Sequence, residues 1–215
     1  MSDRDKIWTF LMSEISNPYG VARLMGNIEA ESAYIPINLQ DAFEKRLAFT
    51  DRTYTDAVDS GIYSREQFTK DGVGYGLAQW TYPTRKAGLY DYCKASNASI
   101  GSLFPQLGYM VDELREMGLI DKLKSAKSVK EASDLILTKY EMPTDQSESV
   151  KDYRARKGLN VYTYYVGDKN NLVRNYLNEA QALITKALDI LKCFFYYRII
   201  IIYAKGGKKK WQLQN

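Results

Sequence analysis

Hydrophobic residues recur at helical spacing in two segments near the start of the chain. Spacings of three and four residues place such side chains on one face of a helix. The segment Asn17–Gly20 between them contains proline and glycine, and Pro36 follows the second segment; such residues interrupt helices. The pattern predicts one amphipathic helix over 4–16 and another over roughly 20–33. Their apolar stripes are Ile7, Phe10, Leu11 and Ile15, then Val21, Leu24, Met25 and Ile28.

The segment 37–80 lacks a sustained helical period and contains Tyr, Thr, Asp and Gly at turn-like intervals. This composition indicates irregular or short β structure, and it favours a segment that carries binding residues, as loops on a rigid scaffold usually do. Helical patterns resume around Leu107–Leu114, and Ser128-x-x-Glu131 is a candidate capping box for a further helix that Met142-Pro143 would end. The fold class predicted is α+β and predominantly α-helical.

The last third of the chain carries two further helical patterns and then a change of character. A polar surface helix is expected over 146–157 and a long amphipathic helix over 171–191. The apolar run 193–204 is about twelve residues long and contains Arg198, whereas a membrane-spanning helix needs roughly 20 apolar residues. We interpret this run first as a strand or helix packed on the body, or as a non-homologous end. A membrane-surface anchor is the alternative.

Composition narrows the chemistry that the chain can perform. The sequence contains no histidine, which excludes Ser-His-Asp and Cys-His constellations and the usual His-containing zinc sites. Cys93 and Cys193 form no CxxC pattern and argue against a four-thiolate metal site. Acid–base catalysis would therefore come from carboxylates, Lys, Tyr or Cys, and glycoside hydrolysis is the best-known use of paired carboxylates. We expect neither a metal nor an organic cofactor.

The positive net charge belongs to the end of the chain. Six of the 30 Lys and Arg residues lie from Lys192 onward, where no acidic residue occurs, so the first 191 residues carry 24 basic and 26 acidic side chains. A nucleic-acid-binding body would normally show its own positive face, which disfavours nucleic acid as a partner. The first ten residues, MSDRDKIWTF, lack a basic region followed by an apolar one, so no signal peptide is expected.

Two carboxylates, Glu29 and Glu31, lie near the end of the second predicted helix, and helical geometry alone does not choose between them. Glu31 stacks beside Ile28 and Leu24 and lies near the helix C-terminus, where the macrodipole disfavours negative charge. Both effects favour the protonated carboxyl that a general acid requires. Two solvated glutamates at a helix end are the alternative.

A second feature is the segment Gly74-Tyr75-Gly76-Leu77-Ala78-Gln79-Trp80. Its glycines let the backbone approach a ligand closely. Tyr75 and Trp80 offer flat faces on which sugar rings can stack, and Gln79 offers an amide with donors and an acceptor. Alone this is a weak signal, because Gly-rich aromatic turns are common.

Taken together, these features resemble the phage tail-type lysozyme family, which belongs to the lysozyme-like superfamily with goose-type lysozymes and lytic transglycosylases. The resemblance rests on Gly26–Ser32, Pro36, Leu39-Gln40 and Gly74–Trp80, in that order. Tyr140-Glu141-Met142-Pro143 resembles a later family segment in which an aromatic–Glu pair is followed by Pro. The resemblance covers roughly residues 5–167.

The resemblance implies a lysozyme-like fold with a small irregular or β region beside the cleft. It also implies cleavage of peptidoglycan glycan strands between N-acetylmuramic acid and N-acetylglucosamine, with Glu31, not Glu29, protonating the leaving oxygen. Gly76, Leu77 and Gln79 would line the saccharide cleft. We expect a substrate-binding role also for Ser32, Gln40, Tyr75, Trp80 and Tyr140.

The second carboxylate is not defined by the resemblance. Phage lysozymes of the muramidase type carry an aspartate nine residues after the acid, where this chain has Gln40 with Asp41 beside it. We favour Asp71 as the supporting carboxylate, because it lies close in sequence to the Gly-Tyr-Gly-Leu turn, and Asp41 comes next. The other acids of this segment are Glu44, Asp51, Asp56 and Asp59.

The resemblance implies a lysozyme-like catalytic domain over 1–167. The residue pattern beyond it, which matches nothing in that family, predicts an amphipathic helix whose attachment the sequence does not define over 168–192 and an apolar then basic tail over 193–215. The expected site of action is the bacterial cell wall, reached either as an extracellular protein or by delivery from a phage or mobile element. We also expect membrane-surface contact through the tail and a further wall-degrading module in a longer parent. Lytic transglycosylase chemistry and a non-catalytic wall-binding or tail module are the alternative functions.

Overall fold

The computed structural model describes residues 1–41, 47–141 and 147–167 and positions 181, 184, 185 and 188. The chain divides into two units, Met1–Val166 and Gly167–Asn215, and the helices between Asp3 and Tyr165 belong to the first. The tail over 193–215 lies outside the described residues, as does most of the helix expected over 171–191, so the domain limits after 167 and 192 stay predictions. In the described part of the chain, no helix is long and apolar enough to cross a membrane.

Helices α1 (Asp3–Ile15) and α2 (Pro18–Ser32) confirm the first two predicted elements. The predicted apolar stripe of α2 is buried along its whole length. The break between the helices is shorter than expected, because the side chain of Asn17 accepts a hydrogen bond from the backbone N–H of Tyr19 and Pro18 occupies the first helical turn. Proline is favoured there, since that position needs no intrahelical N–H bond.

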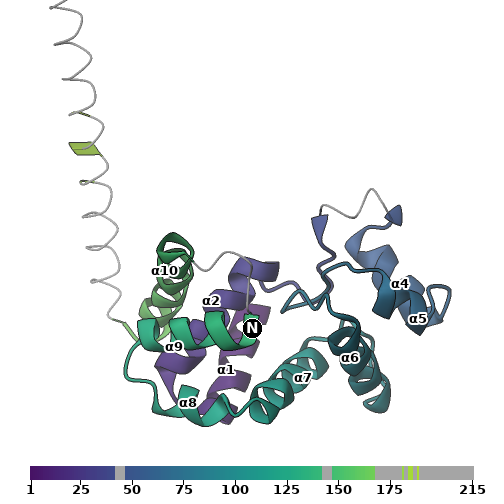
Figure 1. Ribbon diagram of the computed structural model, residues 1–215, viewed down its shortest axis with the longest axis horizontal. Helices are drawn as coiled ribbons and strands as arrows, with labels where there is room; N and C mark the ends of the chain where they lie inside the picture. The colour runs from purple at the N-terminus through teal and green to yellow at the C-terminus, as the bar shows by residue number, and fades with distance from the viewer. Residues whose placement is uncertain (42–46, 142–146, 168–180, 182–183, 186–187, 189–215) are drawn as a thin grey trace, which may run out of the picture. The chain divides into compact units, whose positions relative to one another are not determined.

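The second half of the first unit is a series of helices, of which α8, α9 and α10 contact α2. These are α7 (Leu103–Glu116), α8 (Ile120–Ser125), α9 (Val129–Ile136), the π-helical turn η1 (Leu137–Glu141) and α10 (Glu148–Tyr165). Ser128 caps α9, as predicted, by accepting a hydrogen bond from the backbone N–H of Glu131. Helix α2 packs against α1, α9 and α10 and is the central helix of this group (Figure 1).

Helix α10 extends beyond the polar surface helix expected over 146–157, and it packs closely on α2. The crossing point is a pair of glycines: a Cβ atom built on Gly26 would lie 2.4 Å from the backbone nitrogen of Gly158. On the other side, a Cβ on Gly158 would lie 2.9 Å from Cγ1 of Val129 in α9. Only glycine lets two backbones approach this closely, so these two residues fix the position of α10 on α2.

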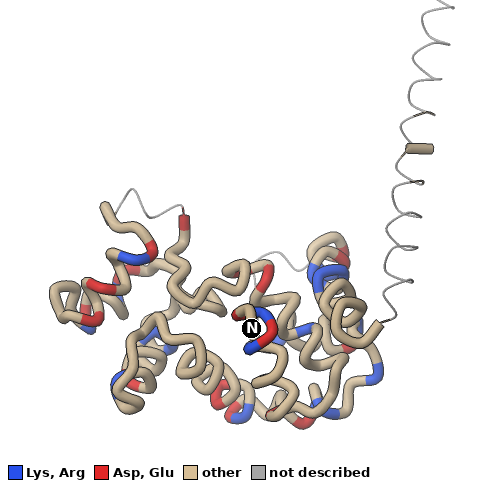
Figure 2. The backbone as a smooth tube through the Cα atoms, turned by 180° about the vertical axis from the view of Figure 1, so that it is seen from behind, with Lys and Arg blue, Asp and Glu red and all other residues tan. Residues whose placement is uncertain are grey.

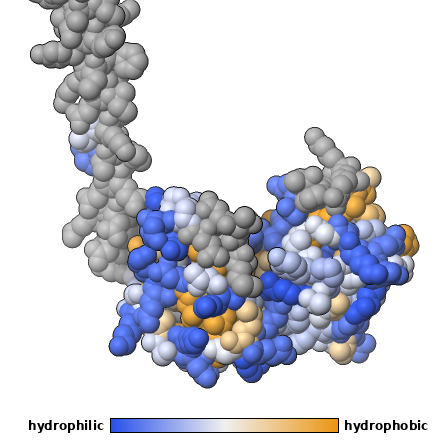
Figure 3. Space-filling model, in the orientation of Figure 1, coloured by the Kyte–Doolittle hydropathy of each residue, from blue (hydrophilic) through white to orange (hydrophobic). Residues whose placement is uncertain are grey.

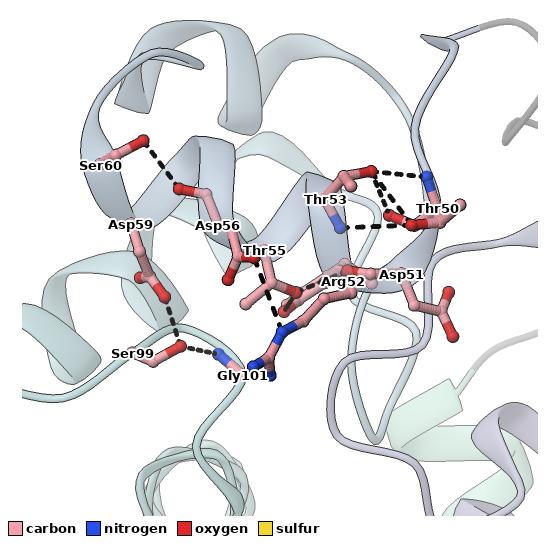
Figure 4. Close-up of polar contacts among 11 residues, drawn as sticks. Thr50, Asp51, Arg52, Thr53, Thr55, Asp56, Asp59, Ser60, Ser99 and Gly101 are labelled. Atoms are coloured by element: carbon pink, nitrogen blue, oxygen red, sulfur yellow. Dashed lines mark hydrogen bonds and ion pairs between the residues drawn. The ribbon is translucent and has the colours of Figure 1, made fainter.

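The expectation of irregular or β structure over 37–80 was wrong for 51–60 and 65–70. This segment contains α4 (Asp51–Ser60) and α5 (Arg65–Lys70), and α6 (Pro83–Ala95) follows. The reason is local: α4 and α5 each begin with a reciprocal capping box, at Thr50 and Ser64, which satisfies backbone N–H groups at the helix start. Figure 4 shows the Thr50–Thr53 box, and at the other end of α4 the Asp59 carboxylate bound by the hydroxyl of Ser99.

The small β region predicted beside the cleft is not seen in the described part of the chain. Within the described residues there are only two isolated antiparallel bridges, Leu39 with Tyr75 and Tyr75 with Trp80. The backbone N–H of Gln40 donates to the carbonyl of Gly74 (3.0 Å), and Gly76 turns the chain with φ of 76°. The fold is therefore predominantly helical, as predicted, with a hydrogen-bonded turn over 74–80 where β structure was expected.

The surface of the first unit carries both signs of charge. Acidic and basic residues are both scattered over the described helices (Figure 2). Most of the face seen in Figure 3 is hydrophilic, with hydrophobic residues exposed in separate areas. The buried aliphatic and aromatic residues form a core that continues from α1 and α2 to α4–α7, and this core holds the turn over 74–80 against the end of α2.

Candidate active site

Glu31 lines two hollows that meet at the C-terminal end of α2. The first, pocket A, is formed by α2, the turn over 74–80, the start of α6, Met110 of α7 and Tyr140 of η1. Glu31 closes it on the α2 side together with Leu24, Asn27 and Ile28. The apolar flank predicted for Glu31 is thus part of the pocket wall.

Pocket B lies on the other side of Glu31 and is more polar. Its wall includes Glu29, Asn38, Gln40 and Asp41. Its volume of about 440 Å³ falls in the range of roughly 300–1,000 Å³ that is typical of ligand sites. Among the residues that the structure describes, only Glu31 and Gln79 line both pockets.

The carboxylate of Glu31 forms an ion pair with a residue that is far away in the sequence. Nη2 of Arg154, in α10, donates to Oε1 of Glu31 at 2.5 Å. The Glu31 side chain is 27% exposed and the Arg154 side chain 16%. Oε2 of Glu31 accepts no hydrogen bond from the described residues, so one carboxyl oxygen is held and the other is available to a ligand.

Glu29, the competing carboxylate, has both oxygens engaged. Oε1 accepts from Nζ of Lys157 (2.8 Å) and Oε2 from the hydroxyl of Tyr34 (3.0 Å). The hydrogen bond to Glu29 raises the pKa of Lys157. Burial, and then the charge of Glu29, raise the pKa of Tyr34. Glu29 lines only pocket B, and because both of its oxygens are bonded within the protein it is more firmly fixed than Glu31.

Behind the wall of pocket A, three side chains converge on Glu113 of α7, whose side chain is 11% exposed. Arg85 donates to it through Nε and Nη2 (2.6 and 2.7 Å), Trp80 through Nε1 (2.8 Å) and Tyr140 through its hydroxyl (2.7 Å). Burial raises the pKa of the Glu113 carboxyl, but the hydrogen bonds and charge of Arg85, with those of Trp80 and Tyr140, outweigh it and leave the pKa lowered. This network holds two residues of the pocket wall, Arg85 and Tyr140, in place.

Five of the expected substrate-binding residues lie at the pockets. Leu77 and Tyr140 line pocket A, Ser32 and Gln40 line pocket B, and Gln79 lines both. The hydroxyl of Ser32 is buried and donates toward the carbonyls of Ile28 (3.0 Å) and Leu77 (3.1 Å). Ser32 therefore joins the end of α2 to the turn over 74–80. Whether any of the five binds substrate stays a prediction.

Tyr75, Gly76 and Trp80 do not line either pocket. Tyr75 and Trp80 are completely buried, and each uses its polar atom inside the protein: the Tyr75 hydroxyl contacts Thr55 Oγ1 at 2.6 Å, and the Trp80 indole binds Glu113. A side chain with no exposed ring face offers no surface for stacking a sugar. The structure thus favours a role in supporting the turn for these residues.

Asp71, the favoured second carboxylate, lies apart from both pockets. Its side chain is 3% exposed and pairs with the fully buried Lys86 at 2.6 Å, while the hydroxyl of Tyr54 donates to its other oxygen at 2.5 Å. Burial lowers the pKa of Lys86, and Asp71 opposes that effect. Asp41, the second choice, lines pocket B together with Glu31.

Residues that the sequence analysis missed complete the site. Arg85 and the exposed Tyr82 line pocket A from the start of α6, and Arg154 reaches Glu31 from α10. Asn27 is 4% exposed and lines pocket A, yet neither Oδ1 nor Nδ2 of its amide hydrogen-bonds to the described residues. Asn27 and Arg154 carry no local sequence signal: one lies within the apolar stripe of α2, and the other is 123 residues from its partner.

Within the described residues, no group of three or more Cys, Asp or Glu side chains is arranged to hold a metal ion. Comparison with known proteins gave one family. The sequence model of that family, described as phage tail lysozyme, matches residues 2–165. No curated protein matches the chain. The match covers all of the residues that form the two pockets.

Proposed function

The chain belongs to the phage tail lysozyme family and is a peptidoglycan-degrading enzyme of the bacterial cell wall; from that premise we propose that it hydrolyses the bond between N-acetylmuramic acid and N-acetylglucosamine, with Glu31 as the general acid. The observation that carries the proposal is the position of Glu31 between pockets A and B. A glycosidase must bind sugar on both sides of the scissile bond, and Glu31 is the carboxyl that both sides share.

The proposed chemistry follows from the two oxygens of Glu31. Oε1 is held by Arg154, and Oε2 has no partner among the described residues. With its carboxyl protonated, Glu31 would donate that proton to the glycosidic oxygen as the bond to the sugar carbon breaks, and an oxocarbenium-like centre would develop on the other sugar. Glu29 is a poor alternative acid, because Lys157 and Tyr34 occupy both of its oxygens.

Gln79 is the strongest candidate for contact with the sugars near the scissile bond. Its amide nitrogen is bound to Asn38 (2.7 Å to Oδ1) and to the carbonyl of Gly76 (3.2 Å). These bonds fix a side chain that, like Glu31, lines both pockets. Tyr82, 71% exposed at the rim of pocket A, offers the flat, accessible face that the buried Tyr75 and Trp80 lack, and aromatic faces bind the apolar side of sugar rings.

For the second catalytic group we propose Asp41 or the acetamido group of the substrate itself. Asp41 lines pocket B with Glu31, as a base or nucleophile on the far side of the sugar would require. On this proposal Asp71 contributes only to the stability of the fold, since its carboxylate faces Lys86 and Tyr54. Ser32 and Gln40 would act by holding the 74–80 turn and the wall of pocket B.

Mass spectrometry of the products from purified cell walls tests this proposal. Hydrolysis releases muropeptides with a reducing N-acetylmuramic acid end. Products one water lighter, with an anhydro ring at that end, would replace hydrolysis with lytic transglycosylation at the same bond. No release of either product would identify a wall-binding or tail module that lacks turnover.

A further inference from the structure

We propose that Arg154 is a positioning residue for the proposed acid: it holds Oε1 of Glu31 and thereby makes Oε2 the oxygen that carries the transferred proton. This inference rests on the proposed function. It assigns a role to α10, an element in which the sequence showed no site residue.

The contact itself is short and partly shielded from solvent. Nη2 of Arg154 lies 2.5 Å from Oε1 of Glu31, and the two side chains are 16% and 27% exposed. Nη1 of Arg154 is buried and makes no hydrogen bond to the described residues. The guanidinium is planar and rigid, and a charge-assisted bond from it is directional. A single strong contact on one oxygen therefore restrains the orientation of the whole carboxyl group.

The position of Arg154 is set by the glycine crossing between α2 and α10. Gly158 lies one turn after Arg154 on the same face of α10, and it touches the backbone of Gly26 in α2. Glu31 lies five residues beyond Gly26. Because this crossing is a backbone contact, Arg154 reaches the acid from a fixed point of the scaffold rather than from a loop, as a positioning role requires.

A second ion pair joins the same two helices and provides a matched control. Lys157 binds Glu29 at 2.8 Å, with side chains 26% and 29% exposed. Both pairs hold α10 on α2, but only Arg154 touches the proposed acid. Loss of either pair should weaken the docking of α10 to a similar extent. Loss of Arg154 alone should change the reaction.

The expected change in rate follows from the geometry of this contact. Without the bond from Arg154 to Oε1, the Glu31 carboxyl is no longer held in one orientation, so the maximal rate should fall. The other ionisable side chains on the walls around Glu31 are the same in every variant compared, namely Glu29, Asp41, Tyr82, Arg85 and Tyr140.

The test compares Arg154→Gln, Arg154→Lys and Lys157→Gln in the full chain. Steady-state rates on soluble glycan strands would give kcat and KM separately, and thermal unfolding would be followed in parallel. We expect Arg154→Gln to lower kcat by about 10- to 100-fold, the order of loss that misplacement of a catalytic group by about 1 Å produces, with KM near that of the wild type. Arg154→Lys keeps the charge and a hydrogen-bond donor and should show a smaller loss of kcat.

Lys157→Gln should keep the wild-type kcat and KM, although it loses thermal stability comparable to that lost by Arg154→Gln. The inference is overturned if Arg154→Gln matches Lys157→Gln in kcat. It is also overturned if Arg154→Lys is as impaired as Arg154→Gln. A wild-type protein that cleaves no wall glycan would instead refute the proposed function, which separates the two failures.

Discussion

Replacing Asp71 with asparagine should destabilise the fold rather than remove a catalytic group. The substitution leaves the Lys86 ammonium fully buried without its ionic partner, next to the hydroxyl of Tyr54 (3.2 Å) and the carbonyl of Val73 (3.0 Å). Neither of those neutral groups can compensate a buried charge. The expected consequence is a lower free energy of unfolding with an unchanged rate constant per folded molecule.

The magnitude follows from the burial of the pair. The Lys86 side chain is 0% exposed and that of Asp71 3%. Removal of one partner from a buried ion pair costs about 3–5 kcal/mol, because an uncompensated charge remains. Replacement of both partners by apolar groups is often close to neutral. The double variant Asp71→Asn/Lys86→Met should therefore recover a large part of the stability that Asp71→Asn loses.

Urea unfolding of the wild type, of both single variants and of the double variant would give the coupling energy between the two residues. For residues in direct contact, this coupling is expected to be about 0.5–3 kcal/mol. The rate of wall-glycan cleavage, measured well below the unfolding midpoint of each variant, gives the second readout. We expect both Asp71→Asn and the double variant to retain wild-type kcat under those conditions.

The opposite pattern would refute this reasoning. An Asp71→Asn variant as stable as the wild type but inactive would make Asp71 a catalytic carboxylate, despite its distance from the pockets. An inactive double variant with restored stability would lead to the same conclusion, because the fold would then be intact and the carboxylate still absent.

Two further predictions concern the walls of pocket A. The lowered pKa of Glu113 means that the folded state favours its ionised form, so this stabilisation is present above the ordinary value of 4.5 and is lost as pH falls below it. The free energy of unfolding of Glu113→Gln should therefore fall less steeply than that of the wild type below about pH 4.5. An equal slope in the two proteins would contradict this. Asn27→Leu removes a buried amide that has no hydrogen-bond partner among the described residues. Urea unfolding should show that the free energy of unfolding rises by about 1–3 kcal/mol. A decrease would reveal a hydrogen bond to that amide.

The long helices could be predicted because their core-facing residues are numerous and regularly spaced. In α2 the four predicted apolar positions are all buried, and the proline that seemed to break the helix starts it. Helix α6 was missed because its core-facing residues include Lys86. A lysine is normally predicted to lie at the surface, and the sequence does not show that Asp71 lies beside this one. Helices α4 and α5 are short and are defined by capping boxes more than by hydrophobic period.

For the site, the family motif placed Glu31 and Gln79 at positions that the structure brings together. It could not separate the aromatic residues that line a cleft from those that support it. Tyr75 and Trp80 look like sugar platforms in the sequence, but their polar atoms bind Thr55 and Glu113 inside the core. Arg154 could not be found at all, since its contact with Glu31 depends on the crossing of α2 and α10 and leaves no local pattern.

The central claim is that Glu31, and not its neighbour Glu29, donates the proton to the glycosidic oxygen. The most direct measurement is the rate of reducing-end release from purified cell walls by Glu31→Gln and Glu29→Gln, with circular dichroism spectra of both variants. Glutamine keeps the shape of the side chain and removes the transferable proton. We predict that Glu31→Gln releases no reducing ends with its helical spectrum intact, and that Glu29→Gln retains most of the wild-type rate. A folded Glu31→Gln variant that works at the wild-type rate, or a folded Glu29→Gln variant that does not work, would contradict the account.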